Sequence, residues 1–329
     1  MQACGGAIQS SGVRQITLVH GTFVGDDPVG VVEVLKKVYP TISKSLAASI
    51  RRIIKRQADH LLADNGNFTE DYASILGEAT AIPCERFHWS SENHHLGRLM
   101  GAARLASYIA DVIIKKQVHS SQRILLLGHS HAGQVFALLA QLLEYEQFGY
   151  RLLEVLQDGG VDIVQLNANL ATIRQISLDF TTFGCPVVYS WPDSGYYRLL
   201  HITNHRGSSH RSGGLRGILT TREGDYIQQL GILGTDAIAV TPQERKLNKK
   251  LDDLFGSGRD LKKWRENLKK RMRVSPHGKT FLINYGDESK SRIPNFVSSF
   301  FGHGIYTRYE VMLYNLRIIT EYFYKHNPR

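Results

Sequence analysis

One stretch of the sequence, GHSHAG at residues 128–133, combines residue types that can carry out nucleophilic chemistry. It follows five residues typical of a buried strand and precedes an apolar run typical of a helix. Gly128 and Ala132 stand two residues before and after Ser130, where small residues let a strand and a helix approach closely. A serine on such a tight turn projects its Oγ above the sheet. The pattern therefore predicts that Ser130 is a nucleophile.

A serine hydroxyl is a weak nucleophile at neutral pH, so Ser130 needs a base to take its proton. His303, in the glycine-flanked stretch FFGHGIYT, is the candidate base, and it would later protonate the leaving group. His129 and His131 flank the serine, but a strand-to-helix turn directs adjacent side chains away from Oγ. We therefore expect the base to come from the distant residue.

Four stretches, in this order along the chain, resemble the α/β-hydrolase superfamily and, within it, lipases and esterases. LVHGTF is similar to the His-Gly turn after an early strand, and GHSHA is similar to the nucleophile elbow, with Ala132 where the strict form has glycine. TTFGCPV is similar to the end of the strand after the nucleophile helix, and FFGHGIYT is similar to the catalytic-histidine loop. The resemblance covers most of the chain except residues 206–278.

This resemblance implies a three-layer α/β-hydrolase fold, with a mostly parallel central sheet and helices on both faces. It implies cleavage of carboxylic esters, lipid esters among them, by a Ser-His-Asp triad through an acyl-enzyme intermediate. The oxyanion would be bound by backbone N–H groups of His131 and of Thr22 or Phe23. No cofactor and no metal are expected.

The sequence leaves the acid of the triad open. In lipases with a TFG-x-P strand the acid usually ends the next strand, and here His205 stands at that place. Asp193 and Asp287 are the favoured alternatives, because each follows a predicted strand. Asp236 is a further alternative, and Asp225 is the least favoured of the four.

The elements that must position these residues alternate along the chain. Strands are expected at 16–23, 82–89, 123–127, 176–188, 198–205 and 279–286, and helices at 28–63, 96–114, 132–145 and 310–324. This alternation predicts a mostly parallel sheet covered on both faces. We expect one domain over residues 1–329 that begins near Ile16, with residues 206–278 as an insertion.

That insertion is strongly basic. Residues 244–279 hold thirteen Lys or Arg against five Asp or Glu, a net charge of +8 (13 − 5) out of +10 for the chain. The spacing predicts two amphipathic helices, at 247–255 and 261–272. They would form either a lid whose basic face meets an anionic lipid surface, or a cap packed on the core. No zinc-finger or RNA-binding pattern accompanies the charge, so no nucleic-acid partner is expected.

Composition bears on the cellular compartment in which the protein is expected. The three cysteines are odd in number and far apart, which argues against a disulfide framework. With no visible signal peptide or apolar run near 18 residues, we expect a cytoplasmic protein. Two alternatives to an esterase stay open: a non-catalytic binding or scaffold protein with the same fold, and an amidase or peptidase with the same triad.

Overall fold

The chain folds around a six-stranded sheet in which all strands are parallel. The computed structural model describes residues 2–21, 68–144, 146–193, 195–207, 223–231, 239, 241–256, 273–286 and 302–325. In space the strands follow the order β2-β1-β3-β4-β5-β6. Their bounds are β1 Val13–Val19, β2 Cys84–Phe87, β3 Arg123–His129, β4 Ser177–Phe183, β5 Tyr197–Asn204 and β6 Lys279–Ile283. The predicted α/β class and parallel sheet are confirmed.

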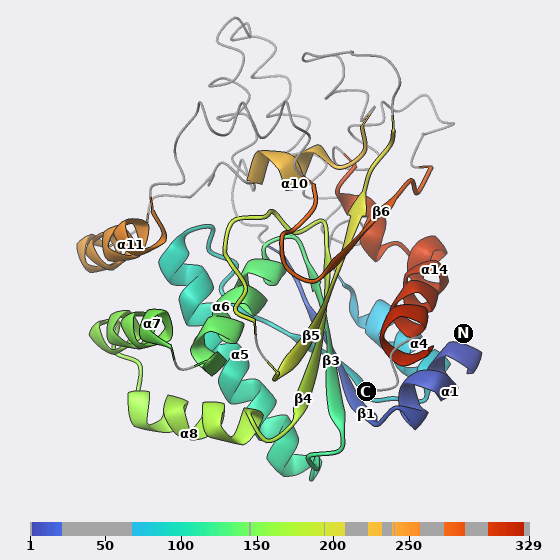
Figure 1. The fold of residues 1–329 in the computed structure, drawn as a ribbon, viewed down its shortest axis with the longest axis horizontal. Coiled ribbons are helices and arrows are strands. Elements are labelled where there is room, and N and C mark those ends of the chain that lie inside the picture. The colour runs from blue at the N-terminus through green and yellow to red at the C-terminus, as the bar shows by residue number, and fades with distance from the viewer. Residues whose placement is uncertain are drawn as a thin grey trace, which may run out of the picture.

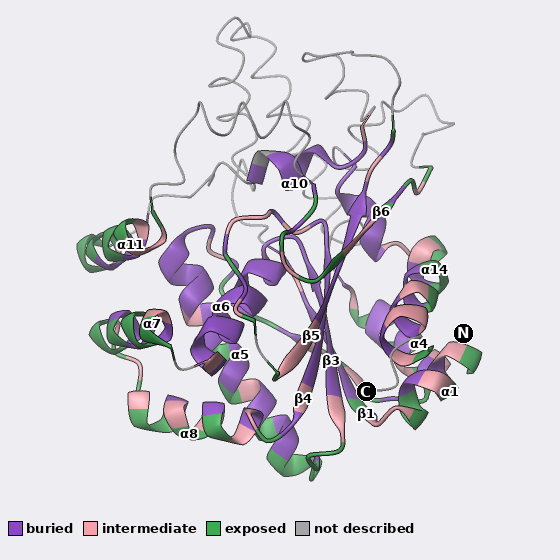
Figure 2. Ribbon diagram, viewed as in Figure 1, coloured by how far each residue is buried: buried purple, intermediate pink, exposed green. Residues whose placement is uncertain are grey.

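Helices cover both faces of this sheet (Figure 1). On one face lie α5 (His95–Lys115), α6 (Ala132–Glu144), α7 (Gln147–Asp158) and α8 (Ile163–Ile173). On the other lie α1 (Gln2–Ser10), α4 (Glu70–Thr80) and α14 (Tyr309–Thr320), which continues into a π-helical turn at Glu321–Lys325. Each helical layer encloses a separate apolar core against the sheet, and the strands and the helix faces toward them are buried (Figure 2).

The N-terminal boundary differs from the sequence-based expectation. The prediction that the fold begins near Ile16 is wrong, because α1 packs on α4 with Ile8 fully buried. A Cβ built on Gly5 would come within 2.6 Å of the Thr80 backbone, so glycine permits this close approach. The helix expected at residues 28–63 lies outside the described residues.

Residues 206–278 form the connection between the neighbouring strands β5 and β6. Their described part contains α10 (Tyr226–Gly231) and α11 (Pro242–Phe255). α11 begins at a capping box made by Thr241 and Glu244, and it buries Leu247 and Leu251 in the core formed with α5 and α7. The first helix predicted in the insertion is thus confirmed, and its apolar face packs on the body of the protein. The second, at 261–272, lies outside the described residues.

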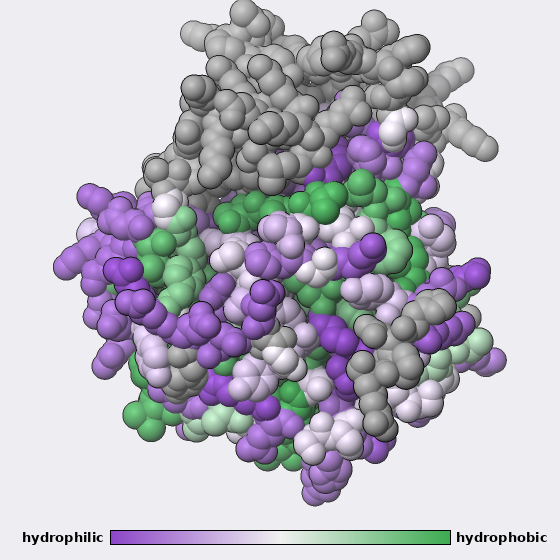
Figure 3. All heavy atoms as spheres, in the orientation of Figure 1, coloured by the Kyte–Doolittle hydropathy of each residue, from purple (hydrophilic) through white to green (hydrophobic). Residues whose placement is uncertain are grey.

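The strand order reverses between β1 and β3. The strand that follows β1 in sequence, β2, lies on one side, whereas β4, which follows β3, lies on the other. In open parallel sheets ligands bind at such a reversal, beyond the carboxyl ends of the strands. Gly21 follows β1 and Ser130 follows β3, so both stand at this point. On the face shown in Figure 3, hydrophobic side chains gather in a band toward this end of the molecule, and smaller hydrophobic patches lie elsewhere on the same face.

Candidate active site

Ser130 occupies a strained turn between β3 and α6. Its φ is +57°, a left-handed conformation that costs a non-glycine residue on the order of 1–3 kcal/mol. Its backbone N–H donates to the Phe183 carbonyl at 2.8 Å, which ties the turn to the end of β4. A Cβ on Gly128 would come within 2.5 Å of the Phe136 ring, so the first glycine of the motif is needed for helix and strand to meet. The strand-to-helix turn predicted from the sequence is therefore present.

The predicted His-Gly turn lies directly against the serine. A Cβ on Gly21 would come within 2.6 Å of Ser130 Cβ, and Trp89 Nε1 donates to the His20 carbonyl at 2.8 Å. Burial lowers the pKa of His20, which favours its neutral form. Thr22 and Phe23, the predicted oxyanion donors of this turn, lie outside the described residues. His131 stands immediately before α6, where the helix dipole favours negative charge near its amide.

His303 forms a buried pair with a carboxylate, and that carboxylate is Asp225. His303 Nδ1 lies 2.8 Å from Asp225 Oδ2, and the two side chains are 1% and 0% exposed. Two further donors satisfy the carboxylate: the Tyr306 hydroxyl at 2.8 Å to Oδ2 and the Gln228 backbone N–H at 2.9 Å to Oδ1. A buried carboxylate requires such partners, and a carboxylate on Nδ1 holds the ring with Nε2 as its acceptor.

Gly184 links the end of β4, which holds the serine turn, to the His303–Asp225 pair. It follows Phe183, to which Ser130 is bonded, and a Cβ on Gly184 would lie 3.1 Å from His303 Cε1 and 2.5 Å from Asp225 Oδ2. The glycine of TTFGCPV thus leaves room for the His-Asp pair. His303 Nε2 is buried without a hydrogen-bond partner among the described residues. Hydrogen bonds between base and nucleophile often tighten only when substrate binds.

Of the two favoured acids, only Asp193 lies among the described residues, and it is not the carboxylate found beside His303. Asp193 is exposed in the loop after β4 and makes no described contact with His303, so its assignment as the acid is corrected. Asp287 and Asp236 lie outside the described residues. Asp225 reaches His303 because the chain after β5 folds back on itself. Gly224 forms an antiparallel bridge with His205, and this bridge places the next residue, Asp225, beside the candidate base. His205, at the expected place of the acid, instead donates its backbone N–H to the Ile283 carbonyl.

Arg273 supports this corner, and nothing in the sequence distinguished it from the other cations of the basic segment. Its side chain is 2% exposed, and Nη1 donates to the carbonyl oxygens of Asp225 and Asn204. Burial lowers the pKa of Arg273, and attraction to Asp225 opposes this shift. The guanidinium therefore offsets part of the buried negative charge while holding the backbone that carries it.

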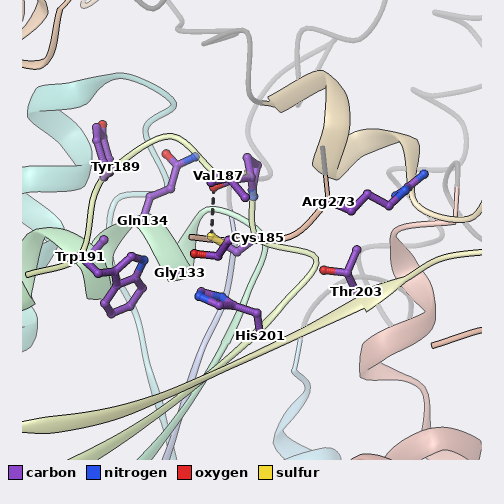
Figure 4. A pocket seen from close by; sticks show the side chains of 12 residues that line it. Gly133, Gln134, Cys185, Val187, Tyr189, Trp191, His201, Thr203 and Arg273 are labelled. Carbon is purple, nitrogen blue, oxygen red and sulfur yellow. Dashed lines mark hydrogen bonds between the residues drawn. The ribbon is translucent and has the colours of Figure 1, made fainter. Parts of the chain in front are cut away.

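A small depression adjoins the first turn of α6 (Figure 4). It encloses about 330 Å³ of empty space, part of it open to solvent. Both amide atoms of Gln134, a buried lining residue, have no hydrogen-bond partner among the described residues, so the depression suits a water molecule or another small polar group. Cys185 also lines it, but burial raises the pKa of this thiol to about 12, so it is not a thiolate nucleophile at neutral pH.

Comparisons with known proteins add no assignment: no family model, no curated protein and no solved structure matches this chain. In the described part of the chain, no helix is long and apolar enough to cross a membrane. Nor do the described residues include a group of three His, Cys, Asp or Glu side chains placed to hold a metal ion.

Proposed function

We propose that this protein is a serine hydrolase that cleaves carboxylic esters, with Ser130 as nucleophile, His303 as base and Asp225 as the orienting acid. The observation that carries the proposal is the buried His303–Asp225 pair at 2.8 Å, beside a serine held at φ +57°. A nucleophile, a base and a group that orients the base are the parts that acyl transfer through serine requires.

In the proposed reaction, His303 Nε2 takes the proton from Ser130 Oγ as Oγ attacks the ester carbonyl. The negative oxygen of the tetrahedral intermediate would accept a hydrogen bond from the His131 amide at the start of α6. When the intermediate collapses, His303 gives the proton to the leaving alcohol and an acyl-serine remains. Water then attacks this ester with the same base, which releases the acid and restores Ser130.

The topology of the sheet supports this assignment independently of the contact between His303 and Asp225. The serine follows β3 and the His-Gly turn follows β1, at the reversal of strand order where parallel sheets place their ligands. The serine-to-acid-to-histidine order along the chain is that of the α/β-hydrolase fold. We therefore propose that the α/β sheet is a hydrolase sheet, with the β5–β6 connection as its cap.

The charge on the exposed face of α11, in the proposed cap, indicates which class of ester the protein cleaves. The exposed face of α11 carries four cations, Arg245, Lys246, Lys249 and Lys250, while its apolar face is packed on the protein. This surface suits contact with an anionic lipid interface through charge rather than through insertion of α11. We propose a lipid ester as the substrate.

A fluorophosphonate probe, which reacts with activated serines, tests the proposal. We expect the wild-type protein to be labelled and the Ser130→Ala variant to be unlabelled, with both folded by circular dichroism. A folded wild-type protein that the probe does not label would instead indicate a binding or scaffold protein. Rates on p-nitrophenyl esters and on the matching anilides then separate an esterase from an amidase.

A further inference from the structure

His129, the last residue of β3, contacts the candidate base His303. Its Nε2 lies 3.0 Å from the His303 carbonyl oxygen, so Nε2 carries a proton and donates it. The imidazole rings of His129 and His303 are tilted by 38° to each other with centroids 4.5 Å apart, and the His129 ring centroid also lies 5.7 Å from that of Tyr306. His129 is fully buried.

The strand explains how the side chain reaches this place. Alternate residues of a strand point to the same face, so His129 shares a face with Leu125 and Leu127. Those two leucines belong to the core beneath α14, where the chain segment that contains His303 also packs. His129 thus follows two leucines on this face of the strand, at the point where the His303 carbonyl accepts a hydrogen bond from its side chain.

The contact joins the two halves of the candidate active site. Ser130 directly follows His129 in sequence, and His303 is the residue whose carbonyl His129 holds. Asn204 Nδ2 donates to the preceding Gly302 carbonyl at 3.0 Å, so β5 fixes the same turn from a second side. Of these two hydrogen bonds, the one from His129 links the turn to β3, the strand that ends next to the candidate nucleophile Ser130.

We infer that His129 is a positioning residue, whose hydrogen bond fixes the backbone of the base relative to the nucleophile. This inference rests on the proposed function, since it assigns His129 a role through His303. Misplacement of reacting groups by about 1 Å can lower a rate on the order of 100-fold, which sets the size of the effect.

A matched pair of variants isolates the hydrogen bond. His129→Gln and His129→Met both lose the ring and have side chains of similar length, but only glutamine can donate to the carbonyl. With a p-nitrophenyl ester we expect His129→Met to lower kcat about 100-fold with KM changed less than about twofold. His129→Gln should recover most of this loss, to within about fivefold of wild type. The unfolding free energies of the two variants should be similar.

Equal kcat values for the glutamine and methionine variants would overturn the inference, because the donor would then be irrelevant. A second readout needs no activity: the His303 Nδ1 proton, observed by NMR, should exchange with water faster in His129→Met than in His129→Gln. If the wild-type protein is unlabelled by fluorophosphonate, the proposed function fails and with it the role of His129 in catalysis. If the wild type is labelled and the two variants match in both readouts, only the role of His129 fails.

Discussion

Replacing Asp225 with asparagine tests the identity of the acid most directly. Asparagine has the same shape, but one carboxylate oxygen becomes an NH2 group. At the Oδ2 position this group would meet two donors, His303 Nδ1 and the Tyr306 hydroxyl. At the Oδ1 position it would meet one, the Gln228 N–H. The second arrangement is favoured, so the amide oxygen keeps its hydrogen bond to His303 and what is lost is the negative charge.

The size of the effect follows from that charge. Two unit charges about 2.8 Å apart interact by about 6 kcal/mol at an effective dielectric constant of about 20. The neutral amide still accepts a hydrogen bond from the imidazolium of His303, which retains about 1–3 kcal/mol. The remaining loss of about 3–5 kcal/mol in the transition state predicts a fall in kcat of about 10²- to 10⁴-fold.

Stability should fall as well, for two reasons. The Gln228 N–H loses its acceptor, which costs about 1–3 kcal/mol in a buried site, and the buried Arg273 loses a nearby opposite charge. We expect the free energy of unfolding to drop by about 2–4 kcal/mol. Urea unfolding measures this drop, and kcat should be determined on protein shown to be folded at the assay temperature.

Asp193→Asn is the matched control, because Asp193 is exposed in the loop after β4. Its kcat and KM should stay within about twofold of wild type. If Asp225→Asn keeps wild-type activity, or if Asp193→Asn loses as much, Asp225 is not the acid and the reasoning from the His303 contact is refuted.

Three further predictions concern one glycine at the site and two buried ionisable residues of the sheet. Gly184→Ala should lower kcat at least about 100-fold, since its Cβ would meet Asp225 Oδ2 at 2.5 Å; activity within tenfold of wild type would contradict the packing argument. Burial lowers the pKa of His201 to about 4, below its unfolded value of about 6.5, so stability present above pH 6.5 is lost as pH falls toward 4, by up to about 1.4 kcal/mol per pH unit. Urea unfolding at pH 7 and pH 5 should therefore show a smaller difference for His201→Phe than for wild type. Asp179, fully buried, accepts from two arginines at 2.7 and 3.0 Å at the other end of β4, so Asp179→Asn should cost about 3 kcal/mol of stability without changing kcat of the folded protein.

The elements could be predicted because their signals are local. The strand β3 contains a short apolar run, β4 is rich in threonine and phenylalanine, and a glycine stands at or next to the end of each. Every expected strand has a counterpart in the sheet. The helices α4, α7 and α8 are absent from the elements expected from the sequence, although the apolar residues of α7 recur at helical spacing and bury one face of that helix. The start of the fold was placed too late because α1 is rich in glycine and alanine, and its packing on α4 has no local signal.

The carboxylate beside His303 could not be ranked correctly for a related reason. Asp193 and Asp287 each follow a predicted strand, which is a local criterion. Asp225 follows no strand, and it reaches His303 only because Gly224 pairs with His205 across the long β5–β6 connection. A pairing between two loop residues leaves no periodicity in the sequence. The usable signal was the stretch GDY before a helix, in which the aspartate accepts from the N–H three residues later.

The contrast between local and long-range contacts also explains why the glycines of the motifs pointed to the site, whereas the positions of the aspartates did not. Gly21, Gly128 and Gly184 each face a neighbouring atom at a distance where a Cβ would not fit, so close packing around Ser130 and the His303–Asp225 pair constrains these positions sterically. A carboxylate has no such constraint on where it enters, because any loop that delivers it within hydrogen-bond reach of Nδ1 satisfies the base. The candidate site is therefore specified by close packing at Ser130 and by the tertiary fold at Asp225. Substitutions at these glycines should affect the rate by displacing groups, and those at Asp225 by removing charge.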